Sequence, residues 1–152
     1  MMLEKAPETH LFRDLISVED LLSGLAPRHR RSLARIEHHS HFAPDTLVFD
    51  SHDQPEQIFV HRGGKLALFR NDRVEDLLSA CPVGAGCIYG LVEALSGSDF
   101  KMSAKTITES DFDVIDRDEF LRFIKNEPEL CFRLAELLSR MYQHALETIK
   151  AH

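Results

Sequence analysis

Hydrophobic positions in the first part of the chain recur with the spacing of helices. Ser17 is followed three residues later by Asp20 and then by two leucines, which is the pattern of a capped helix start. Pro27 suits the first turn of a second helix that carries Leu33 on its apolar side. We therefore expect residues 1–38 to be helical.

After this region the pattern changes to short alternating runs separated by turn residues. The runs that favour strands lie at 46–49, 57–61, 66–69, 74–78 and 111–116. Strands this short, divided by this many turns, are typical of a jelly roll. The expected fold class is mainly β with flanking helices: a double-stranded β-helix (jelly-roll) barrel over residues 42–116, with N-terminal helices and a long C-terminal helix.

Helical spacing returns over residues 117–150. Pro128 is expected to start a helix of about twenty residues, which is about 30 Å long at a rise of 1.5 Å per residue. A heptad-like seam follows along this helix, formed by Leu134, Leu138, Met141 and Ala145. The helix has more apolar surface than one neighbour buries, so we expect a homodimer through residues 128–149. The alternative is a lid that packs on its own barrel.

Composition and charge restrict the function. The 152 residues contain no Gly/Ser-rich linker, which predicts a single domain over 1–152. The formal net charge of −7 disfavours direct DNA binding. No apolar run approaches the roughly 20 residues of a membrane span, and the N-terminus has no secretory core. Three cysteines without C-x-x-C spacing favour a cytoplasmic location and argue against a disulfide scaffold.

Four short motifs follow one another in a recognisable order. They are GAGCIYG at 84–90, ALSG at 94–97, DVIDRDEF at 113–120 and EPEL at 127–130. Together they resemble the phosphate-binding cassette, the last strand with its following helix, and the start of the long helix in the cyclic-nucleotide-binding domain of the catabolite activator protein family. The resemblance runs from about residue 20 to about residue 149. The chain ends without the helix-turn-helix domain of the family's transcription factors, which also predicts no direct DNA binding.

The resemblance implies where a ligand would bind. In the family a glycine admits the ligand to the backbone, the next residue is a glutamate that accepts from the ribose 2′-hydroxyl, and an arginine about ten residues later pairs with the phosphate. Here Gly90 is in place, but Leu91 stands at the glutamate position and Phe100 at the arginine position. The expected ligand pocket, a degenerate cassette, consists of Gly84, Gly86, Gly90, Leu91, Val92, Phe100, Lys101 and Met102.

Both ionic contacts of the family are therefore replaced by apolar side chains. A phosphate without its charged partner costs about 2–5 kcal/mol, and the missing ribose acceptor about 1 kcal/mol more. This sum is on the order of three to four decades in affinity. We expect a stand-alone regulatory or sensor module that performs no chemistry and does not bind cAMP or cGMP in the family's manner, with no cofactor identified.

The altered cassette allows three alternatives to an unoccupied pocket of the usual kind: other nucleotide contacts, a filled pocket, or a different ligand. A genuine nucleotide binder with non-standard contacts would use Lys101, or Glu93 from the cassette helix. Otherwise Leu91 and Phe100 fill the vacated pocket and seal the barrel, or they line a pocket for a different, apolar ligand.

Histidines suggest a metal-binding alternative. His39 and His41, two residues apart, with Asp45 and Cys87 loosely resemble the ligand set of a cupin-like metal-binding jelly roll that takes zinc or iron. The simpler interpretation is that these are surface histidines and that Cys87 is a buried thiol. His61, at a strand end, is expected to be exposed.

A second group of charges lies on the second helix. Its members are Arg28, Arg30, Arg31 and Arg35. They form an exposed helix face or, alternatively, a docking surface for an acidic protein partner.

Overall fold

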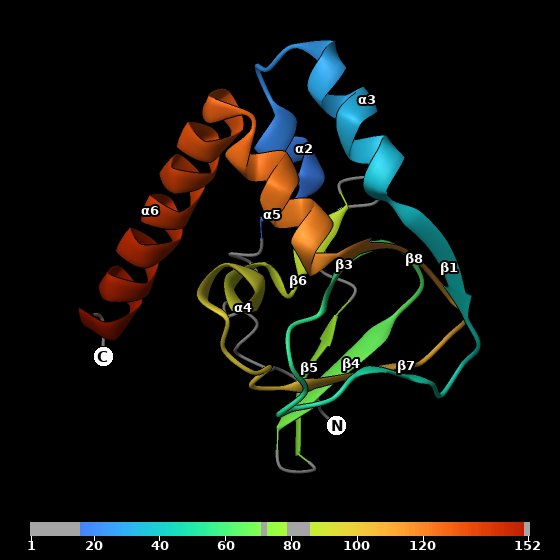
Figure 1. Cartoon of the computed structure of the whole chain (residues 1–152). Coiled ribbons are helices and arrows are strands. Elements are labelled where there is room, and N and C mark those ends of the chain that lie inside the picture. Colours follow the sequence, from blue (N-terminus) through green and yellow to red (C-terminus); the bar gives the residue numbers. More distant parts are fainter. Residues whose placement is uncertain (1–15, 71–72, 79–85, 151–152) are drawn as a thin grey trace.

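The chain folds into two antiparallel sheets with helices gathered at one end (Figure 1). The computed structural model describes residues 16–70, 73–78 and 86–150. In the described residues the strand orders are β1-β8-β3-β6 and β2-β7-β4-β5. The strands are β1 (His38–Phe42), β2 (Leu47–Phe49), β3 (Gln57–Gly63), β4 (Leu66–Arg70), β5 (Arg73–Leu78), β6 (Cys87–Tyr89), β7 (Ser103–Thr106) and β8 (Ser110–Asp116). The helices are α2 (Val18–Leu22), α3 (Pro27–Ile36), α4 (Leu91–Ser96), α5 (Arg117–Lys125) and α6 (Pro128–Lys150).

The N-terminal helices follow the sequence pattern. The Ser17 side chain accepts a hydrogen bond from the backbone N–H of Asp20, and the Asp20 side chain accepts one from the Ser17 backbone, so a capping box opens α2. Pro27 begins α3, as expected. The expected boundary between helices and strands is wrong, however, because β1 already begins at His38. Five residues of β1 pair with β8, and this pairing outweighs the weak β propensity of its sequence.

The expectation of a closed barrel is also corrected. Each sheet of the described strands has two edges: β1 and β6 in one, β2 and β5 in the other. The two sheets are joined by side chains that pack between them, rather than by a continuous hydrogen-bonded ladder.

Alternation along β3 divides the core into two clusters. Ile58 and Val60 pack with the helices, while Phe59 packs between the sheets with aromatic residues of other strands. His61 is also buried, so its expected exposure is wrong; β3 continues to Gly63 and places this side chain inside the roll. Burial lowers the pKa of His61 and favours its neutral form.

Helix α6 starts at Pro128 as expected and runs beside α2 and α5 before extending past them (Figure 1). Leu134 is only 4% exposed and belongs to the core of its own chain. Leu138 and Met141 are half-buried against the same cluster, whereas Ala145 is exposed. The first part of the expected seam therefore packs against the core of its own chain and is not free to contact a second copy. No helix of the described residues has the length and apolar content to cross a membrane.

Candidate functional site

The short helix α4 lies at the position that the sequence resemblance predicts for the cassette helix. Gly90 precedes it with a φ of 92°, and Gly97 ends it with a φ of 79°, both in the left-handed region that favours glycine. The Arg117 side chain donates a hydrogen bond of 2.7 Å to the carbonyl of Ala94. The end of β8 and the start of α5 thus hold the C-terminal turn of α4 in position.

Phe100 takes the space in front of Gly90. Its ring stacks on Phe49, with centroids 4.4 Å apart. A Cβ atom on Gly90 would lie 3.1 Å from Cζ of Phe100. Leu91 and Phe100 are each 4% exposed. The glycine that the resemblance reserves for a ligand therefore admits an aromatic ring of the chain itself.

A pocket of about 180 Å³ remains beside this ring. Six of the expected residues line it: Gly90, Leu91, Val92, Phe100, Lys101 and Met102. Gly86 does not line it; this glycine lies beside Arg62, where a Cβ would be 2.6 Å from Nη1. Gly84 is outside the described residues. The other lining residues are Ile16, Phe49, Leu68, Ile88, Tyr89, Glu93 and Met141.

Sequence reasoning missed the part of the wall that comes from distant elements. Ile16 precedes α2, and Met141 lies on α6, far from the cassette motif in sequence. The heptad pattern that singled out Met141 indicated a buried face without saying what the face would contact. Phe49 and Leu68 come from the sheet opposite β6.

Charge is sparse at this pocket. Among its lining residues, only Glu93 and Lys101 have charged side chains. Glu93 is half-buried and Lys101 is exposed. No arginine lines it. The described pocket therefore lacks the bidentate donor that matches a phosphate.

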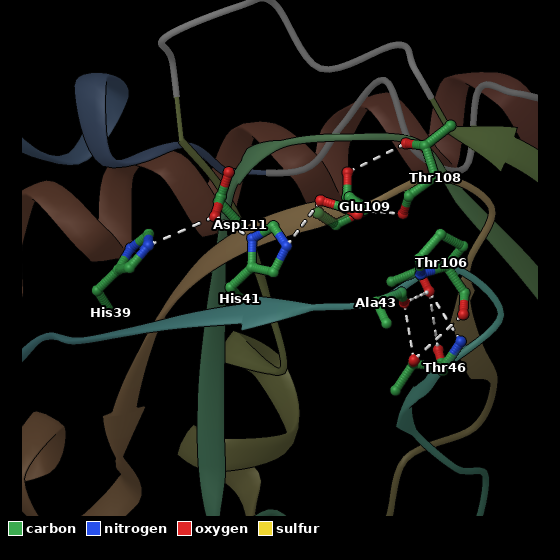
Figure 2. A network of polar contacts seen from close by, with 10 residues as sticks. His39, His41, Ala43, Thr46, Thr106, Thr108, Glu109 and Asp111 are labelled. Carbon is green, nitrogen blue, oxygen red and sulfur yellow. Dashed lines mark hydrogen bonds and ion pairs between the residues drawn. The ribbon is translucent and has the colours of Figure 1, made fainter.

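Two histidines of β1 belong to a polar network on the outer face of a sheet (Figure 2). In His41, Nδ1 lies 2.9 Å from a carboxylate oxygen of Asp111, and Nε2 lies 3.0 Å from one of Glu109. His39 Nε2 is 3.4 Å from the same Asp111 oxygen. These histidines pair with carboxylates because β1 and β8 align His41 with Asp111 and His39 with Asp113.

The cupin-like ligand set is not brought together. Asp45 forms an ion pair of 3.0 Å with Lys105. Cys87 is buried, as expected, but it is disulfide-bonded rather than a thiol. In the described part of the chain, the donors within 4.8 Å of one another that suit a metal belong instead to His38, Asp116 and Glu119. These side chains are exposed or half-exposed, and we assign them no function.

The His41 network predicts a pH dependence of stability. The nearby carboxylates raise the pKa of His41, first through its hydrogen bond to Asp111, and that bond lowers the pKa of Asp111. Because the pKa of His41 is higher in the folded state, the histidine stabilises the fold below about pH 6.5, and this stabilisation is lost as the pH rises through the folded pKa. Because the pKa of Asp111 is lower in the folded state, the aspartate stabilises the fold above about pH 3.8, and this stabilisation is lost as the pH falls through the folded pKa. The pair therefore contributes most between about pH 4 and 6.5.

Titration of the His41 imidazole by NMR measures this effect directly. We expect its midpoint above that of an unperturbed histidine, and we expect Asp111→Asn to move it downward. A midpoint at or below the unperturbed value in the unaltered chain would contradict the network.

Two of the four arginines of α3 form ion pairs within the chain. Arg28 is bound to Glu127 by two contacts of 3.0 Å, and Arg30 lies 3.4 Å from Glu19. Arg31 and Arg35 are exposed. Between the paired arginines, the fully buried His29 lies 3.0 Å from Glu129, so this helix is fastened to the start of α6.

No protein-family model matches the sequence, and no curated protein matches it. Solved structures do match. The catabolite activator protein of Thermus thermophilus has a TM-score of 0.72 and 23% identity, over 87% of this chain and 62% of that one. The N-terminal domain of a transcriptional regulator from Streptomyces coelicolor A3(2) has a TM-score of 0.70 and 15% identity, over 89% and 94%. A protein from Geobacter metallireducens GS-15, provisionally described as cyclic-nucleotide-binding, has a TM-score of 0.66 and 14% identity, over 95% and 99%.

These likenesses concern the arrangement of the elements. The chain spans less than two thirds of the Thermus protein and nearly all of the other two. At identities of 23% and below, shared architecture is what is established. The resemblance noted in the sequence is confirmed at this level: the chain has the fold of the cyclic-nucleotide-binding domain found in catabolite activator proteins.

Proposed function

We propose that this chain is a regulatory module of the cyclic-nucleotide-binding type whose cassette no longer holds cAMP or cGMP in the usual way. The observation that carries this proposal is the burial of Leu91 and Phe100 at the two positions where the resemblance places a glutamate and an arginine. The module acts through ligand binding or protein contacts and performs no chemistry.

Calorimetry with cAMP and with cGMP tests the proposal. Because the phosphate and the ribose each lose a partner, we expect no saturable binding in the submillimolar range. Submillimolar affinity for either nucleotide would overturn the proposal.

A second candidate is a nucleotide binder with non-standard contacts. It is favoured by the position of Lys101 and Glu93 among the residues that line the pocket. In that case Lys101→Ala and Glu93→Ala would each abolish the binding detected by calorimetry. Binding that survives both substitutions would exclude this route.

We also propose that two copies of the chain pair through α6. One face of the helix carries exposed residues spaced three, four, three, four and three apart: Phe132, Ala135, Ser139, Tyr142, Leu146 and Ile149. Phe132 and Ile149 are each 68% exposed and Tyr142 is 63% exposed. A seam of this period and apolar content is what a two-helix contact requires.

The pairing of the strands supports a jelly roll as the finer description of the fold. The pairs β4–β5, β3–β6, β2–β7 and β1–β8 are those of one long antiparallel ribbon folded back on itself. Rolling this ribbon places its halves in two facing sheets, and we propose that residues 1–152 form a single domain built around it.

A further inference from the structure

The pocket beside Gly90 has the size of a small hydrocarbon. Protein interiors seldom contain voids larger than a water molecule. An engineered apolar cavity of about 150 Å³ stays dry and binds benzene. The present pocket, at about 180 Å³, has a comparable volume but is partly open to solvent, where the exposed Val92 and Lys101 line it.

Its walls are predominantly apolar and come from three parts of the fold. Leu68 and Phe100 contribute from the side of one sheet, Ile88 from β6 of the other, and Leu91 from α4. Water in such a space would find few partners, whereas an apolar molecule would replace the missing van der Waals contacts.

The charged residues at this pocket do not select a charged ligand. Glu93 and Lys101 carry opposite charges, so together they give the pocket lining no net charge. Burying a charge without a fully paired site is unfavourable. The ligand that fits best is therefore neutral.

Resting on the proposed function, we propose that this pocket binds a neutral, apolar molecule with one aromatic ring or a chain of about six to eight carbons. Such a molecule would contact Met141 of α6, next to Tyr142 on the exposed seam. One wall of the ligand site is thus formed by the proposed dimer helix itself.

Methionine methyl resonances provide a local readout. The sequence has four methionines, of which Met102 and Met141 line the pocket. In protein labelled with ¹³C at the methionine methyl groups, toluene is expected to shift these two signals saturably, with Met102→Leu and Met141→Leu supplying the assignments. Benzoate, the charged analogue, is expected to bind at least about tenfold more weakly.

A pocket-filling variant and its control complete the experiment. Met102→Trp is expected to raise the dissociation constant for toluene at least about tenfold, whereas Ile107→Trp, at a position 44% exposed and outside the pocket, leaves it unchanged. Absence of a saturable shift up to the solubility of toluene, or equal affinity for benzoate, overturns the inference. Saturable binding of cAMP that shifts the same two signals would instead overturn the proposed function.

Discussion

Replacing Phe100 with alanine is expected to lower the free energy of unfolding by about 3–5 kcal/mol, as measured by urea denaturation. The phenyl ring is 4% exposed, stacks on Phe49 and lies against the backbone of Gly90. Its removal leaves a void that joins the neighbouring pocket, and the wall around it is fixed by two sheets and a helix. The surrounding structure therefore collapses little, and most of the lost contact energy is not recovered.

The adjacent residue provides a matched control. Lys101 is exposed, and Lys101→Ala is expected to change the free energy of unfolding by no more than about 0.5 kcal/mol. A loss below about 1 kcal/mol for Phe100→Ala would mean that the ring is not packed against Phe49 and Gly90 as described.

The large effect at Phe100 follows from a substitution that the sequence already shows. The resemblance, through the ungapped count back from Phe120, places Phe100 at the arginine position, and the structure finds the residue buried at the pocket. Sequence motifs predicted the structure correctly where neighbouring residues determine it. Ser17 and Asp20 cap α2 through side chains three residues apart, and Gly97 ends α4 through its left-handed backbone.

Sequence motifs gave wrong predictions where contacts with distant parts of the chain determine the structure. The segment His38–Phe42 has no β-branched residue, yet it is a strand because β8 supplies an aligned partner for each of its five residues. His61 is hydrophilic in sequence and buried in the fold because β3 extends beyond it. Neither the Met141 side of the pocket nor the carboxylates beside His41 was predictable without knowing which elements meet.

The two seams of α6 illustrate this limit in one helix. The stripe that begins at Leu134 and the exposed stripe that begins at Phe132 both have heptad spacing, and they share no residue. Burial separates them: Leu134 packs within the protomer, and Tyr142 and Leu146 face outward. Sequence periodicity identifies apolar stripes but does not say whether a stripe contacts its own chain or a second copy.

This separation makes Leu146→Glu the most direct test of the proposed dimer. Leu146 is 38% exposed in the single chain, and pairing two copies along the seam would bury it twice. Two carboxylates in an apolar contact are expected to cost the dimer about 2 kcal/mol or more, which is about a 30-fold increase in its dissociation constant. Sedimentation velocity over a range of micromolar concentrations measures this shift.

Gln143→Glu is the control, because Gln143 is exposed on α6 but lies outside the seam, and the substitution introduces the same carboxylate. It is expected to leave the dissociation constant within about threefold, since a single exposed charge changes such a contact by only a few tenths of a kcal/mol. Equal weakening by both variants would indicate a general effect of charge on α6. An unaltered chain that sediments as a monomer at the highest concentration would show that the exposed seam does not pair with a second copy.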